Sequence, residues 1–144
     1  MASLAIKTIR ARLATALEAA AGWNESVYAF EMFGRDVQQL LHQSFAVGVP
    51  SSAAHTSDGR QRLSEACYLE DQVQIAWAYG MRADNQVADY DLALDAEQVA
   101  VQTILAVSRA DLHLVLTGMD RRTVPEGWVL GTITLRALHR YALE

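Results

Sequence analysis

One stretch, residues 67–81, constrains the fold more than any other part of the chain. Large apolar side chains stand at every second position, with glutamines and alanines between them: Val73, Ile75, Trp77 and Tyr79. Because successive side chains of a β-strand point to opposite faces of a sheet, this period of two predicts a strand. One face of that strand is strongly apolar and the other is milder. The chain therefore contains a sheet with at least one face that must be covered.

Two other segments show the three- and four-residue spacing of apolar side chains that is typical of amphipathic helices. The first is residues 2–21, and Gly22 follows where a helix would end. Its alanine-rich flank would permit close approach of a second copy. The second helix is predicted from about Asp89 or Asp91 to Ser108, because aspartates favour the positive end of a helix.

Further runs rich in β-forming residues predict the partner strands. Pro50 either ends the strand that it follows or places that strand at a sheet edge. The last two strands form a hairpin with a connection of about ten residues, in which Arg121 and Arg122 lie in a solvated turn. The predicted strands are residues 27–32, 40–50, 112–117 and 128–141.

This order of elements predicts an α+β fold for the whole chain, residues 1–144, as a single domain. The sheet is expected to be mostly antiparallel, with about four to five strands and two helices packed on one face. The second face would then be exposed or would contact a partner.

The chain is acidic, with a formal net charge of −5. A domain that grips DNA phosphates is normally basic, so the charge argues against tight nucleic-acid binding but not against proximity to DNA. Cys67 is the only cysteine, which excludes an intrachain disulfide and suits a reducing compartment. No export or membrane-spanning segment is recognisable, so we expect an intracellular protein without a membrane partner.

The sequence contains no pattern of an enzyme, a metal site or a cofactor site. Its four histidines are scattered, and none are paired at a zinc-binding spacing. His113 and His139 could become neighbours across the final hairpin, but ordinary polar strand positions explain them better. No nucleophile elbow, phosphate loop or dinucleotide fingerprint is present. We therefore expect a chain that is not an enzyme and binds no cofactor and no metal.

Two polar segments are candidate contact regions. Residues 51–64 have almost no large apolar side chains, and a long irregular stretch in a compact domain is usually functional. The expected partner-contacting residues in this loop are His55, Thr56, Asp58, Arg60 and Arg62.

An acidic group precedes or begins the second helix and comprises Asp84, Asp89 and Asp91. The segment lacks the glycine and the ligand spacing of a calcium loop. Helix capping explains these residues most simply, and a negative surface that faces a partner or DNA is the functional alternative.

The layout resembles that of the tail terminator proteins of long-tailed bacteriophages, the lambda-type family that also occurs in related tail-like particles. The shared features are a long N-terminal helix, a polar loop, a second helix and a closing hairpin. Two sequence stretches carry the resemblance, Phe-Ala-Val-Gly-Val-Pro at 45–50 and Asp-Gln-Val-Gln-Ile-Ala-Trp-Ala-Tyr-Gly-Met-Arg at 71–82. The similarity covers nearly the whole chain in layout and size.

The resemblance implies a structural role in a virion tail assembled in the cytoplasm of a bacterial host. Members of the family form a ring, usually a hexamer, that caps the tail tube and ends its polymerisation. The ring presents a joining surface to a head-side neck or connector protein, and DNA passes through it without being held. On this reading the 51–64 loop contacts the tube or neck, and Asp84, Asp89 and Asp91 face the channel.

Two other functions are compatible with the residues. The chain could be another neck or tail component, such as a head-closure or tube protein. It could also be a small α+β binding domain unrelated to phages. A binding domain would stay monomeric, whereas a terminator associates into a ring and binds tail tubes.

Overall fold

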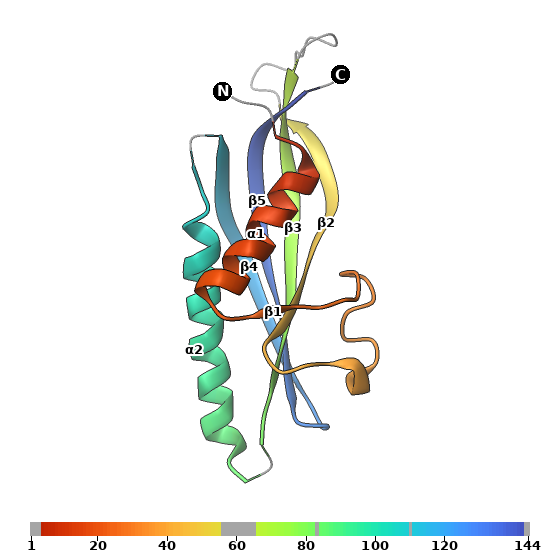
Figure 1. Cartoon of the computed structure of the whole chain (residues 1–144), viewed down its shortest axis with the longest axis vertical. Coiled ribbons are helices and arrows are strands. Elements are labelled where there is room, and N and C mark those ends of the chain that lie inside the picture. The colour runs from red at the N-terminus through yellow and green to blue at the C-terminus, as the bar shows by residue number, and fades with distance from the viewer. Residues whose placement is uncertain (1–3, 56–65, 83, 110, 143–144) are drawn as a thin grey trace.

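The computed structural model describes residues 4–55, 66–82, 84–109 and 111–142. Five strands form one sheet in the order β1-β2-β3-β5-β4, and every neighbouring pair is antiparallel except β1 and β2, which are parallel. The predicted α+β class is confirmed (Figure 1). The elements are α1 (Ile6–Ala20), β1 (Asn24–Glu25), the 3-10 helix η1 (Val37–Gln39), β2 (Ser44–His55), β3 (Ala66–Gly80), α2 (Gln86–Leu105), β4 (Leu112–Val124) and β5 (Trp128–Ala142).

Strand β3 is the centre of the sheet and corresponds to the strand predicted at 67–81. It pairs with β5 along its whole length, from Ala66 opposite Ala142 to Gly80 opposite Trp128. Its other edge pairs with β2. Because β3 is paired on both sides, its backbone groups are satisfied within the sheet. On its apolar face, Val73, Ile75 and Trp77 are buried.

Both helices pack on the same face of the sheet, as predicted. The apolar residues of β3 at odd positions join α1 and α2 in one continuous core. In Figure 1, α1 crosses the sheet diagonally and α2 runs beside edge strand β4. The buried core residues from these three elements are Ile9, Leu13, Leu17, Val73, Ile75, Trp77, Ala93, Ala100 and Ile104.

The opposite face of the sheet is partly covered by the chain itself. Ala78 lies on the face opposite Trp77, since neighbouring strand residues alternate, and it forms a second core with Leu40 and Leu130. Phe30 lies so close to Gly48 that a Cβ atom at this glycine would come within 2.5 Å of the phenyl ring. The segment between β1 and β2 therefore forms a third layer, which corrects the expectation that this face is left wholly to solvent or a partner.

The strand predicted at 27–32 is wrong, because these residues form turns. Only Asn24 and Glu25, just before them, pair with β2. The segment has many β-forming residues but no alternation between a buried and an exposed face: Val27 is 93% exposed, whereas Phe30 is packed on the sheet. β-propensity reflects how a side chain fits a packed surface, so composition alone does not determine a strand.

Several predicted ends of elements are also wrong, because the strands continue through polar residues and glycines where the prediction ended them. β2 continues to His55 through a register shift between Gly48 and Ser51, so Pro50 lies within an edge strand and residues 51–55 are not irregular. A bulge accommodates a proline there because it relieves the strict pairing. At the other edge of the sheet, β4 also contains a register shift, between Leu116 and Gly118.

The strands of the final hairpin are longer than predicted, and the second helix begins earlier than predicted. The connection between β4 and β5 spans residues 125–127, not about ten, and Arg121 and Arg122 lie within β4 instead of a turn. Helix α2 starts at Gln86 because the side chain of Asn85 accepts a hydrogen bond from the Ala88 N–H at 3.2 Å. Asparagine is a strong N-cap residue, and the sequence analysis overlooked it.

The absence of a side chain at Gly131 determines where Trp77 packs. A Cβ atom at Gly131 would lie 2.3 Å from the indole ring, whereas a Cβ atom at Gly118 on the neighbouring strand would meet nothing within 4 Å. We predict that Gly131→Ala lowers the free energy of unfolding by about 1–3 kcal/mol through overpacking. Urea denaturation followed by tryptophan fluorescence measures this change. Gly118→Ala is the control, and equal effects of the two substitutions would contradict the packing argument.

Candidate functional site

The loop predicted to contact partners lies mostly outside the described residues. Thr56, Asp58, Arg60 and Arg62 fall in the undescribed range. His55 is the last residue of β2, and its side chain also falls outside the description. The contact role of this loop therefore stays a prediction.

The three aspartates predicted to face a channel have different environments. Asp84 and Asp91 are exposed. Asp89 is only 3% exposed and is bound by Arg82, whose backbone N–H donates at 2.7 Å and whose guanidinium donates at 3.1 and 3.2 Å. Asp89 thus lacks the exposure that a channel-facing charge requires. Its role in this structure is to fix the connection between β3 and α2.

The hydrogen bonds from Arg82 also fix the charge of Asp89. The guanidinium and backbone N–H bonds lower the pKa of the Asp89 carboxyl, and the same side-chain bond raises the pKa of Arg82. This pair stays ionised at neutral pH and anchors the start of α2 to the end of β3.

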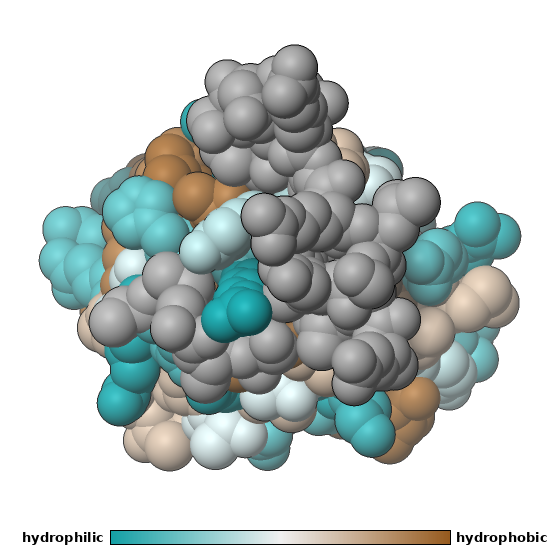
Figure 2. All heavy atoms as spheres, turned by 90° about the horizontal axis from the view of Figure 1, so that it is seen from above, coloured by the Kyte–Doolittle hydropathy of each residue, from teal (hydrophilic) through white to brown (hydrophobic). Residues whose placement is uncertain are grey.

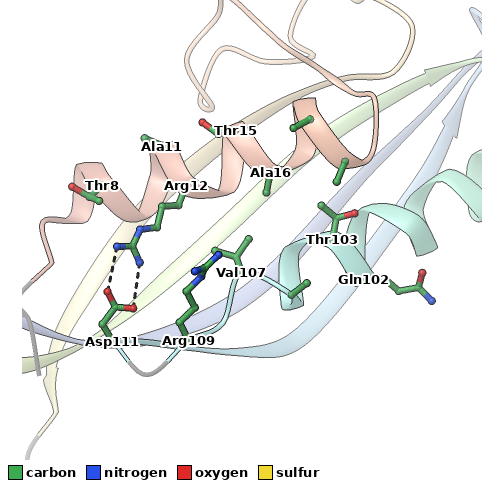
Figure 3. Close-up of a pocket in the computed structure, with 13 residues that line it drawn as sticks. Thr8, Ala11, Arg12, Thr15, Ala16, Gln102, Thr103, Val107, Arg109 and Asp111 are labelled. Atoms are coloured by element: carbon green, nitrogen blue, oxygen red, sulfur yellow. Dashed lines mark hydrogen bonds and ion pairs between the residues drawn. The ribbon is translucent and has the colours of Figure 1, made fainter.

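A groove runs between the two helices on the outer side of the molecule (Figure 3). It has a volume of about 950 Å³ and is walled by α1, by the last turns of α2 and by the connection to β4. Most side chains in it are small, so the two helices leave an open depression instead of a filled seam. The lining residues from the helices include Thr8, Ala11, Thr15, Ala16, Thr103 and Ala106.

One end of the groove carries a charged cluster with a surplus cation. Arg12 of α1 donates two hydrogen bonds to Asp111, at 3.3 and 3.2 Å, which lower the pKa of that carboxyl. This bidentate pair ties α1 to the connection that follows α2. Arg109 reaches from the same connection toward α1 in Figure 3, and it forms no ion pair with any residue in the described part of the chain.

Helix α2 carries apolar residues on both its buried side and its exposed side. Ala93, Ala100 and Ile104 are buried against the sheet. On the outer side, Leu92 is 48% and Val99 is 45% exposed, and Val99 lies one turn before the groove residue Thr103. Asp95 is exposed between them, one turn from each, so the outer side of α2 presents two large apolar side chains beside a charge.

A second exposed apolar surface lies on the opposite layer, in the segment between β1 and β2. Val27 is 93% exposed, Met32 is 52% exposed and Leu41 is 66% exposed. In Figure 1 this segment projects beyond β2, on the side of the sheet away from α2. The segment thus exposes several large apolar side chains that a partner could cover.

The end of the molecule where α1 begins and β5 ends has a different character. Figure 2 looks onto this end, and the described residues around it are mainly hydrophilic, with separate smaller hydrophobic areas.

The structure contains a buried ionisable pair that the sequence analysis missed. His139 Nε2 lies 2.6 Å from Asp71 Oδ2, and both side chains are completely buried. His113 is exposed on the other face of the sheet, so the two histidines are not neighbours. Asp71 stands at an odd position of the period-two strand, which assigns it to the core, and this was the available signal.

Other buried charges also serve to join elements. Glu97 of α2 accepts a hydrogen bond from Arg121 of β4 at 2.6 Å and is 3% exposed. Within the described residues, no group of three or more histidine, cysteine, aspartate or glutamate side chains is arranged to hold a metal ion. Neither of the described α-helices combines the length and the apolar character that crossing a bilayer requires.

Comparisons with known proteins identify no family. No protein-family model matches the sequence, and no curated protein matches it. Among solved structures, a protein from Akkermansia muciniphila, determined without its transmembrane region, aligns with a TM-score of 0.43 and 12% identity, covering 93% of this chain and 80% of that one. A second structure from the same organism has a TM-score of 0.38 and 12% identity, covering 93% and 74%. Similarity this low carries no argument about function.

The bond between Asp89 and Arg82 predicts a specific pH dependence. Because the folded-state pKa of Asp89 is lowered, its ionised form contributes stability above the unfolded-state pKa, near pH 4, and this contribution is lost as the pH falls through the folded-state pKa. Asp89→Asn should therefore destabilise the protein at neutral pH, by a margin that shrinks below about pH 4. Urea denaturation across a pH series tests this. Asp91→Asn, at an exposed position, is the control, and a margin independent of pH would contradict the assignment.

Proposed function

We propose that this chain is a structural subunit that assembles head to tail into a ring, with the role of a phage-type tail terminator. In this role the ring caps a tail tube, ends its polymerisation and offers a joining surface to a head-side neck protein. The observation that carries the proposal is the exposure of two large apolar side chains, Leu92 and Val99, on the outer side of α2, a helix whose inner side is already buried.

The position of the second apolar surface supports a ring over a two-fold dimer. The apolar side of α2 lies on the helical layer, whereas Val27 and Met32 lie on the layer beyond β2. Contacts between two different surfaces are heterologous, and they produce closed rings when the rotation between copies closes. Because the two surfaces lie at opposite edges of the sheet, a two-fold contact through one flank would leave the other surface uncovered.

The acidic balance of the chain agrees with passage of DNA through such a ring. A lumen that captured phosphates would release counterions, bind DNA and hinder its movement. Asp84 and Asp91 are exposed next to α2 and remain our candidates for the channel side. Neither forms an ion pair with a residue in the described ranges, and Asp84 interacts electrostatically with the exposed Arg82.

The ring proposal predicts association of the purified chain and binding to the ends of tail tubes. Size-exclusion chromatography with light scattering should give a mass of several copies, and negative-stain images should show rings with a central opening. The test also includes purified phage tail tubes. There the chain should be found at tube ends and not along tube walls.

A substitution on the outer side of α2 provides the matched comparison. Val99→Asp should reduce association strongly, because it places a charge on the apolar surface. Val115→Asp is the control, since Val115 is 36% exposed on the other face of the sheet. A chain that stays monomeric at high concentration and ignores tail tubes would refute the proposed function.

A further inference from the structure

We infer that the contact between neighbouring copies is formed by residues 27–32 of one copy, the projecting segment, seated in the groove between α1 and α2 of the next. The inference rests on the proposed ring function and names the surfaces that would build it. The partner of the groove is accordingly a second copy of this chain.

The groove is open and provides space for inserted side chains. Its volume is about 950 Å³, and its helical walls consist largely of alanine and threonine. Val99 extends its apolar surface along α2, one turn before Thr103. A pair of large apolar side chains seated there would bury its own surface and that of the groove. Burial of apolar area is the main driving force of association.

The projecting segment is held ready for such a contact before any partner binds. At its start, the Ser26 N–H donates to the Phe45 carbonyl at 2.7 Å, and the Tyr28 N–H donates to Ser26 Oγ at 3.1 Å. At its end, the Met32 N–H donates to the Ala29 carbonyl at 2.9 Å.

Phe30, in the middle of the segment, packs against the backbone at Gly48. These contacts fix the backbone while Val27 and Met32 point to solvent, at 93% and 52% exposure. Association therefore requires little additional ordering of the segment, and such preorganisation favours binding.

The charges of the two surfaces are complementary. Glu31 is exposed on the projecting segment, and Arg109 lies in the groove; neither forms an ion pair with a residue in the described part of the chain. Arg12 forms an ion pair with Asp111 at that end of the groove, and Arg109 also interacts electrostatically with Asp111. Two cations around one anion leave this end of the groove with a surplus positive charge, and the segment presents a negative charge, which favours this pairing and its register.

The two surfaces cannot meet within one copy, because they lie at opposite edges of the sheet. Figure 1 shows the projecting segment beyond β2 and α2 beside β4, at the opposite edge. One copy can therefore donate its segment to one neighbour and accept a segment from another. This arrangement repeats around a ring and leaves no copy with a free surface once the ring closes.

Cross-linking tests the contact directly. The full-length chain with Met32→Cys is mixed with the full-length chain carrying Ala106→Cys, and a short bis-maleimide is added. We expect cross-linked dimers in the mixture and not from either variant alone. The chain carrying both substitutions should give a ladder that ends at the copy number of the ring. The unsubstituted chain controls for Cys67, and Met32→Cys mixed with Val115→Cys controls for random collision.

Charge reversal tests the register. Glu31→Arg or Arg109→Glu alone should weaken association by about tenfold, because each places like charges opposite one another. The two substitutions together should restore association to near that of the unsubstituted chain. Both residues are on the surface, and circular dichroism would verify that each variant is folded.

The outcomes separate this contact from the proposed function. Rings that form without cross-links between positions 32 and 106, and that are unaffected by charge reversal, would overturn the contact and leave the ring proposal standing. Cross-links between two copies of Ala106→Cys alone would show a two-fold groove-to-groove contact and would also overturn it. Failure to associate at any concentration, with or without tail tubes, would refute both.

Discussion

The packing of Trp77 against Gly131 is the contact on which the rest of the fold depends. Trp77 stands in the central strand, and the missing side chain on β5 provides the space for its indole ring. Trp23, just after α1, meets this ring edge-on with centroids 5.7 Å apart. One contact therefore fixes the alignment of β3 with β5 and the position of the end of α1. The core at this point leaves little freedom in how the helical layer sits on the sheet.

The placement of this core explains why apolar surface remains on the flanks. The inner side of α2 and the apolar side of α1 are used against the sheet, and the segment after β1 uses Phe30, Phe33 and Val37 against the other face. Leu92 and Val99 on one flank, and Val27 and Met32 on the other, find no place in either core. The monomer thus satisfies its own folding requirements and still exposes two separate apolar surfaces. Head-to-tail assembly is the arrangement that covers both in every copy.

The sequence allowed prediction of the parts of the fold that have strong periodicity. The central strand, the two helices and the α+β class follow from alternation and helical spacing, which depend only on which side faces the core. The segment 27–32 was not predictable from β-propensity, because its conformation depends on Phe30 packing at Gly48, a contact distant in sequence. The bond between Asp89 and Arg82 and the groove at Arg109 depend on how elements meet in space. The alanine-rich flank of α1 was a partial signal, since Ala11 and Ala19 line that groove.

The central claim is that the outer side of α2 is an interface between copies. A cryo-electron-microscopy structure of the assembled chain, at a resolution that shows side chains, tests this most directly. The account predicts a closed ring in which Val99 and the groove between α1 and α2 of each copy are covered by the projecting segment of a neighbour. A ring in which the outer side of α2 faces solvent, or an assembly made only of two-fold dimers, would contradict it.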